Sequence, residues 1–208
     1  RIIYGTKYSL SIGIMSVSIG LIFGTTMGVL SAYYGGLVDT IIMRFIDALL
    51  AFPGILLALV VIAVLGPGLF NVMLAVGIST VPEYARLARG KVLSVMQLEY
   101  IEAIHSIGGS NIRVILKHIL PNISAPITIL ATLQVGNAIL VGSGLSFLGM
   151  GAQPPTPEWG LMTAEGRNFM SQAWWISTFP GIAILITVIS INQFGDGLRE
   201  AFDPYLKD

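Results

Sequence analysis

The chain has 208 residues, of which 54% are hydrophobic and only 11% are charged, and its formal net charge is +0. A soluble domain carries roughly 25% charged residues because its surface must be solvated, so this composition excludes an ordinary soluble protein. The zero net charge provides no overall field that would attract nucleic acid. Cysteine is absent, which excludes disulfides and thiolate metal sites.

The few charged residues leave long uncharged gaps. These gaps run from Lys7 to Asp39, from Asp47 to Glu83, from Lys117 to Glu158 and from Arg167 to Asp196. Because a helix needs about 20 residues to cross ~30 Å of hydrocarbon, each gap is long enough for at least one span. Open sheet edges cannot be satisfied in lipid, so the sequence predicts an all-α fold, a polytopic bundle of membrane helices over residues 1–208.

Five segments are predicted as membrane helices. They are residues 9–33, 41–65, 69–85, 119–141 and 176–194. In the first segment, Gly20, Gly24 and Gly28 are four residues apart and share one helix face. Small residues at this spacing let two helix backbones approach closely, which predicts a packed interface, either in a pore-forming bundle or in ordinary membrane-helix packing.

Proline and glycine mark the second segment at both ends. Pro53-Gly54 predicts a kink near its start, either as a hinge or as a fit to neighbouring helices. Gly66-Pro67-Gly68 separates it from the third segment.

Two acids lie near the ends of predicted spans. We expect Asp47 to pair with Arg44 and Asp196 to pair with Arg199, close to the membrane surface. An acid inside the membrane would instead be a functional candidate.

The polar connection 86–118 carries five of the eleven basic residues of the chain. Basic loops face the cytoplasm, so we expect this connection and the C-terminal tail on the cytoplasmic side and connection 142–175 outside. This count places Arg1 and Lys7 outside, and a further helix upstream of residue 1 would restore the rule. Trp159, Trp174 and Trp175 predict an aromatic belt at the outer interface.

Within this connection, residues 99–107 predict a short amphipathic helix. Its apolar face consists of Ile101, Ile104 and Ile107. Gly108-Gly109 ends it, and Ser110 or Asn111 is expected to cap a second short helix reaching Lys117. Two such helices suit docking into another protein, although a solvated linker explains the same pattern.

These residues resemble a known family. Glu102-Ala103, then Gly108, then Leu120-Pro121 resembles the EAA loop of ABC importer permeases, whose consensus is E-A-A, three residues, G, nine residues, I-x-L-P. Ile104 stands where Ala is usual, and His118 where Ile is usual. His-x-Leu-Pro-Asn at residues 118–122 is typical of the peptide and nickel branch.

The resemblance covers essentially the whole chain and is similar to the C-type permease of dipeptide and oligopeptide importers. It continues in residues 4–10, in Leu145-Ser146-Phe147-Leu148-Gly149, in residues 153–157 with Trp159-Gly160, and in Pro180-Gly181, Asn192, residues 195–199 and Asp203-Pro204. The start of the match implies that the first membrane helix of the family lies outside this sequence. Gly142 stands where Glu is common.

The resemblance implies an assembly and a site. A second permease, expected to be a different chain, would complete the pathway in the cell inner membrane. Two ATP-binding subunits would bind the cytoplasmic loops, and an extracytoplasmic binding protein would deliver the substrate. The residues expected to couple to the ATPase are Glu99, Glu102, Ala103, Ile104, Gly108 and Gly109.

No catalytic or metal site is expected in the chain, nor any cofactor of its own, since ATP would be used by the partner. Gly90-Lys91 is followed by Val92, and residue 85 is Ala, so the chain has no phosphate-binding loop. Two alternatives remain: nickel import by the same architecture, and an ATP-independent secondary transporter or channel.

Overall fold

The computed structural model describes residues 1–202, apart from the side chain of His105, so Asp203-Pro204 lies outside the described residues. Every regular element in this part is a helix, which confirms the all-α prediction. In chain order the elements are α1 (Ile2–Ile19), η1 (Gly20–Gly24), α2 (Thr25–Tyr34), α3 (Gly36–Leu50), α4 (Gly54–Leu65), α5 (Leu69–Met96), α6 (Glu99–Ser106), α7 (Asn111–Val114), η2 (Ile115–Ile119), α8 (Leu120–Phe147), α9 (Trp159–Gly166), η3 (Arg167–Phe169), α10 (Met170–Ala173) and α11 (Trp175–Phe202).

Three continuous helices are long and apolar enough to cross a membrane. They are Ile2–Tyr34, Asn111–Phe147 and Trp175–Phe202, of 33, 37 and 28 residues. The bent pair α3–α4 is a fourth candidate. Polar residues keep α5 out of this group, although its 28 residues extend about 42 Å at 1.5 Å each. These helices make the chain a multi-pass membrane protein.

The predicted second segment, 41–65, is not one helix. The axes of α3 and α4 meet at 93°. Proline disfavours helical angles in the residue before it and cannot donate a helix hydrogen bond, so Pro53-Gly54 ends one helix and starts another. The expected kink is therefore a full break.

The other four membrane helices run beyond their predicted bounds, and the last continues to Phe202 rather than ending at residue 194. The first begins at Ile2 rather than at residue 9, and α5 continues to Met96, inside the predicted connection 86–118. The predicted second short helix is wrong as a separate element, because the helix that starts at Asn111 continues unbroken to Phe147. Ser110 occupies its N-cap position, but the side chain makes no capping hydrogen bond.

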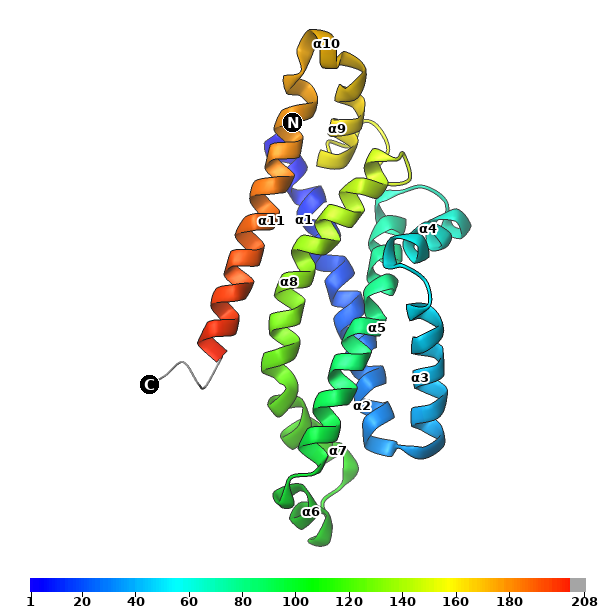
Figure 1. Ribbon diagram of the computed structural model, residues 1–208, viewed down its shortest axis with the longest axis vertical. Coiled ribbons are helices and arrows are strands. Elements are labelled where there is room, and N and C mark those ends of the chain that lie inside the picture. The colour runs from blue at the N-terminus through cyan, green and yellow to red at the C-terminus, as the bar shows by residue number, and fades with distance from the viewer. Residues whose placement is uncertain (203–208) are drawn as a thin grey trace.

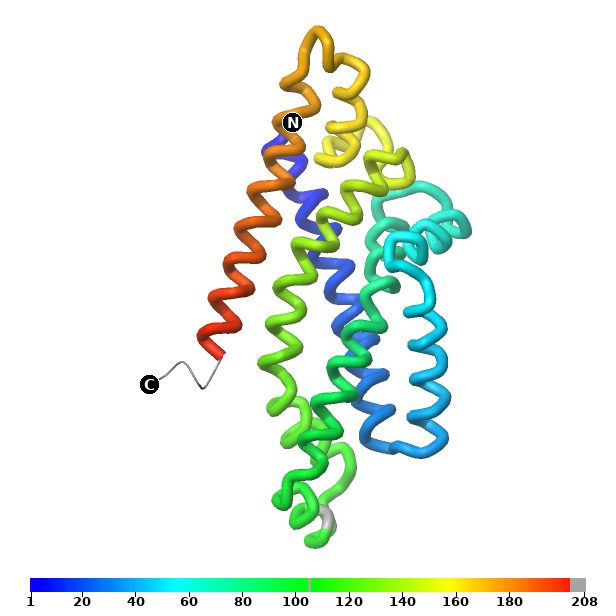
Figure 2. The backbone as a smooth tube through the Cα atoms, in the orientation of Figure 1, coloured from blue at the N-terminus to red at the C-terminus, as the bar shows by residue number. Residues whose placement is uncertain are grey.

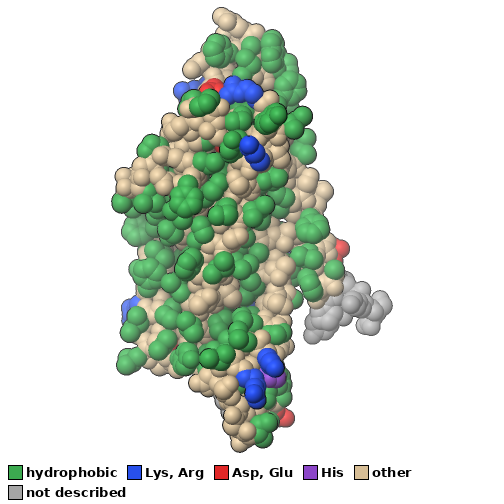
Figure 3. All heavy atoms as spheres, turned by 180° about the vertical axis from the view of Figure 1, so that it is seen from behind, with side chains coloured by type: hydrophobic (Ala, Val, Ile, Leu, Met, Phe, Trp, Pro, Cys, Tyr) green, Lys and Arg blue, Asp and Glu red, His purple; other side chains and the backbone are tan. Residues whose placement is uncertain are grey.

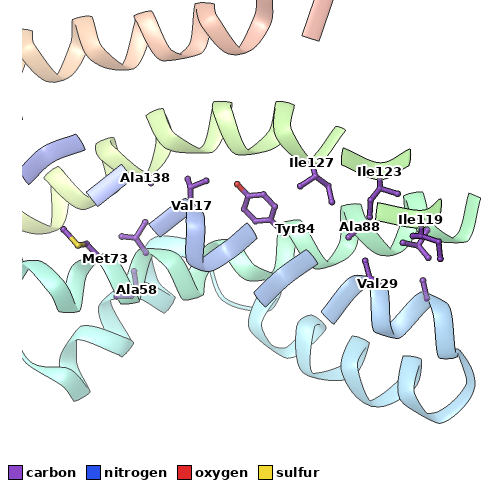
Figure 4. Packing of buried hydrophobic residues seen from close by; sticks show 14 of the residues in the cluster. Val17, Val29, Ala58, Met73, Tyr84, Ala88, Ile119, Ile123, Ile127 and Ala138 are labelled. Atoms are coloured by element: carbon purple, nitrogen blue, oxygen red, sulfur yellow. The ribbon is translucent and has the colours of Figure 1, made fainter. Parts of the chain in front are cut away.

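The core lies between α1, α5 and α8, which contribute Val17, Tyr84 and Ala138 to one buried cluster (Figure 4). Tyr84, the largest side chain among the fully buried ones, is 0% exposed. On the face drawn in Figure 3, most Lys and Arg side chains lie toward the two ends, and hydrophobic side chains cover the region between them. This distribution suits a protein whose middle lies in lipid.

The glycine face of the first helix packs on α5. A Cβ at Gly24 would lie 2.5 Å from the carbonyl oxygen of Val81, and a Cβ at Gly28 would overlap the carbonyl of Ala85. At Gly20 it would overlap the hydroxyl of Thr80. Only glycine permits this approach, so the helices are closest along this stripe.

The two polar connections lie at opposite ends of the molecule, α6 at one and α9–α10 at the other (Figure 1). The smooth trace of Figure 2 shows how the helices of the bundle run between these ends. Trp174 and Trp175, at the α10 end, are 54% and 48% exposed, whereas Trp159 is 3% exposed. The expectation that Trp159 lies in an aromatic belt is therefore wrong.

A buried carboxylate stabilises this end. Glu158 is 0% exposed and is the N-cap of α9, where it accepts hydrogen bonds from the backbone N–H groups of Gly160 at 2.9 Å and Leu161 at 2.8 Å. The hydroxyls of Ser9 and Ser143 also donate to it, at 3.1 and 3.3 Å. One carboxylate therefore joins α1, α8 and α9.

Candidate functional site

The short helix α6 forms one tip of the molecule (Figure 1). Glu99 and Glu102 lie in its first turn, where negative charge is favourable next to the free N–H groups. Ile101 is 1% exposed and belongs to the core, and Ile104 packs against that core. Ile107, predicted on the same apolar face, follows the end of the helix and is 84% exposed.

Two glycines end α6. Gly108 has φ +80°, in the left-handed region that suits glycine. The N–H of Gly109 donates to the carbonyl of Ile104 at 2.9 Å, which is the long hydrogen bond of a Schellman motif. A Cβ on Gly109 would lie 2.5 Å from Cγ2 of Ile104, so this turn has no room for a side chain.

The six predicted coupling residues fall into two groups. Glu99, Glu102 and Ala103 are exposed, and Gly108 is exposed in the turn beside them. Ile104 and Gly109 face inward and shape the turn. The structure therefore brings two carboxylates and a small side chain onto the outer surface of the tip, over a rigid apolar base.

One hydrogen bond joins α6 to α8, and a second joins α2 to α7. The side-chain amide of Asn122, in the first turn of α8, donates to the hydroxyl of Tyr100 at 3.1 Å. Tyr33, at the end of α2, donates to the side-chain oxygen of Asn111 at 3.0 Å. Sequence reasoning missed Tyr100; the signal was its place beside Glu99, on the same turn as the predicted contact.

Three exposed apolar side chains follow α6 in the chain. Ile107, Ile112 and Leu116 are 84%, 69% and 58% exposed. Exposed apolar side chains of this size are available for contact with lipid or with another protein. The residues that the structure describes contain no group of three His, Cys, Asp or Glu able to hold a metal ion.

Ion pairs fix α3 along α5 near the same end. Arg89 donates to both carboxylate oxygens of Asp39 at 2.7 Å, and Ser31 donates to one of them. Such a two-pronged pair fixes the relative orientation of the helices.

Asp47 also has a partner, but the predicted one is wrong. Its carboxylate accepts from Arg86 at 2.9 Å, not from Arg44, because α3 lies beside α5. Asp196 and Arg199 are both exposed, and no ion pair joins them within residues 1–202.

Residues 20–208 match the family described as "Binding-protein-dependent transport system inner membrane component". The chain is 48% identical over 207 residues to the glutathione transport system permease protein GsiD of Pectobacterium atrosepticum, covering 100% of this chain and 69% of that protein. It is also 48% identical over 207 residues to the dipeptide transport system permease protein DppC of Alkalihalophilus pseudofirmus, covering 100% of this chain and 68% of that protein.

Two solved structures share the fold. An inward-facing form of the MetNI methionine ABC transporter superposes with a TM-score of 0.75 at 18% identity, covering 96% of this chain and 94% of that chain. An amino acid ABC transporter with histidines gives 0.73 at 12% identity, covering 97% and 94%. By sequence and fold together, the chain belongs to the family of binding-protein-dependent transport system inner membrane components and is a permease subunit of an ABC importer.

Proposed function

We propose that this permease forms half of a translocation pathway for dipeptides or oligopeptides, and that α6 couples it to a separate ATP-binding subunit. The peptide class rests on relatives that are named as dipeptide and glutathione permeases at 48% identity. The coupling role rests chiefly on one observation: α6 presents Glu99, Glu102 and Ala103 on the exposed tip.

The rest of the assembly follows from this placement. The α6 end, with five basic residues in the 86–118 connection, faces the cytoplasm, where two ATP-binding subunits bind the loops of the two paired permeases. The α9–α10 end receives an extracytoplasmic binding protein, and a second, different permease completes the pathway. The permease itself catalyses no reaction and binds no cofactor, since the ATP is held by the partner subunits.

Coupling requires that motion of the tip reach the membrane helices. The Tyr100–Asn122 hydrogen bond at 3.1 Å and the buried Ile101 join α6 to the bundle, so α6 moves with the helices rather than separately. Closure of the ATP-binding subunits then changes the helix arrangement, because ATP favours whichever arrangement makes the better contacts with them.

The experiment reconstitutes the complete importer in vesicles and measures ATP hydrolysis and peptide uptake. Glu102→Lys reverses the charge of the exposed tip, and Gly108→Pro cannot adopt the observed φ of +80°. We expect uptake to fall by about tenfold or more, the effect of losing ~1.4 kcal/mol of coupling, while both variants still insert in the membrane.

Glu200→Lys is the matched control, because this acid is also exposed but belongs to α11 rather than to α6. Normal uptake in both tip variants would contradict the docking role. Uptake that continues without the ATP-binding subunits would favour a secondary transporter. ATP-dependent uptake of nickel but not of peptide would show that nickel, rather than a peptide, is the substrate.

A further inference from the structure

A polar cluster lies on the surface of this chain, about halfway along the helices of the bundle. Glu83 lies halfway along α5 and is exposed. Gln134, halfway along α8 and 7% exposed, donates its side-chain N–H to the carboxylate of Glu83. Asn137, one turn further along α8 and exposed, donates to the side-chain oxygen of Gln134 at 3.1 Å.

Packing places this cluster at mid-depth. The η1 segment Gly20–Gly24 lies near the middle of the 33-residue helix Ile2–Tyr34, and a Cβ on Gly20 would meet Thr80 and Tyr84. Glu83 adjoins Tyr84, so it lies at the level of η1. The two ends of α5, Leu69 and Met96, each lie about 20 Å from Glu83 along the helix.

The carboxylate of Glu83 has no cationic partner among residues 1–202. The ion pairs there join Arg1 to Glu165, Arg86 to Asp47, and Arg89 to Asp39. Arg86, one turn from Glu83, is therefore already engaged with Asp47. Ionisable groups at this depth are costly in lipid and almost always face a water-filled cavity, a pathway or another protein.

We propose that Glu83, Gln134 and Asn137 form a binding station on the wall of the translocation pathway, where Glu83 receives the protonated amino group of the passing peptide. This deepens the proposed function and rests on it. Gln134 is held by burial and fixes the carboxylate, while the exposed amide of Asn137 is available to peptide N–H and C=O groups.

The chemistry of this station explains how it accepts many sequences. Every peptide with a free amino terminus carries the ammonium group, and every peptide has backbone amides, whatever its side chains. The carboxylate of Glu83 and the exposed amide of Asn137 thus recognise what all these substrates share. A single charged contact also holds the peptide weakly enough to release it onward.

The first measurement uses the absence of cysteine from the chain. Asn137→Cys supplies one thiol on this chain, in the same polar cluster as Glu83. Ile22→Cys supplies a control at the same depth. Ile22 is 57% exposed and lies between the two glycines of η1 that face α5. In the complete importer complex in detergent, small cationic and anionic methanethiosulfonate reagents are compared. We expect the thiol at 137 to react, with the cationic reagent favoured about tenfold by the nearby carboxylate.

The second measurement adds Glu83→Gln and a ligand. In the Asn137→Cys background, Glu83→Gln is expected to abolish the preference for the cationic reagent. We expect dialanine to slow labelling at 137. N-acetyl-dialanine is expected to have little effect on labelling, and Glu83→Gln is expected to remove the protection by dialanine. Reactivity at position 22 is expected to be unaffected by either peptide.

Three results would overturn the proposal. The first is a thiol at 137 that is unreactive in every state, which means that the second permease covers it. The second is equal protection by both peptides. The third is a preference for the cationic reagent that survives Glu83→Gln. The failure is separable from that of the proposed function, since an importer that still takes up peptide with ATP while showing any of these results refutes the station alone.

Discussion

The contact of Gly24 with α5 sets the distance between two helices of the core. A Cβ at this position would lie 2.5 Å from the backbone oxygen of Val81 and 2.6 Å from Cβ of Tyr84. Ordinary contacts between such atoms begin near 3.5 Å, and neither the backbone nor a Cβ can rotate away. Gly24→Ala therefore forces the helices apart by about 1 Å, which we expect to cost about 1–3 kcal/mol of folding free energy.

Gly90→Ala is the control, because Gly90 lies within α5 and a Cβ there meets no atom within 4 Å. Alanine at such a helical site stabilises by about 0.4–1 kcal/mol. Thermal unfolding of the purified permease in detergent, followed by loss of the monodisperse species, measures both. At about 2–4 °C per kcal/mol, we expect Gly24→Ala to lower the Tm by roughly 2–12 °C. Equal Tm values for the two variants would refute the packing argument.

Two further substitutions test the polar contacts. Glu158→Ala leaves four hydrogen-bond donors without their acceptor, and we expect it to cost about 2–4 kcal/mol of folding free energy in the same thermal assay. Its control is Glu165→Ala, which removes an ion pair whose side chains are 59% and 35% exposed. We expect this control to cost below about 1 kcal/mol. Asp39→Asn loses a partly buried, two-pronged ion pair and is expected to cost about 1–3 kcal/mol of folding free energy. Its control is Asp47→Asn, whose ion pair has side chains that are 60% and 56% exposed. We expect this control to cost below about 1 kcal/mol.

Each pair of variants has a definite contrary result. If Glu158→Ala unfolds at the same temperature as Glu165→Ala, the buried carboxylate does not hold that end together. If the two aspartate variants are indistinguishable, burial and bidentate geometry do not separate their ion pairs.

The helices were predictable from the spacing of the charges, because a membrane helix needs a long stretch without them. The positions at which these helices begin and end were less predictable. Nothing in the sequence shows that the helix from Asn111 passes through Pro121 and Pro126 without a break, since each proline removes one hydrogen bond without always ending a helix. The 93° turn at Pro53-Gly54 depends on what α4 packs against, which the local sequence does not contain.

Within the site, the glycine turn after α6 was readable from Gly108-Gly109, because a left-handed residue has a sequence signature. Glu158 was not, since a lone acid in a polar connection looks solvated and its hydroxyl donors lie 149 and 15 residues away in the chain. Glu83 did carry a signal that was missed: it is an acid inside the predicted span 69–85.

The unbroken helix from Asn111 to Phe147 has a mechanical consequence. At about 1.5 Å per residue, its 37 residues make a rod some 55 Å long that begins beside α6 and ends near the buried carboxylate of Glu158. Because the helix is continuous, a displacement of one end is passed along its length. A displacement of the end beside α6 therefore also reaches the other end of the helix, beside Glu158.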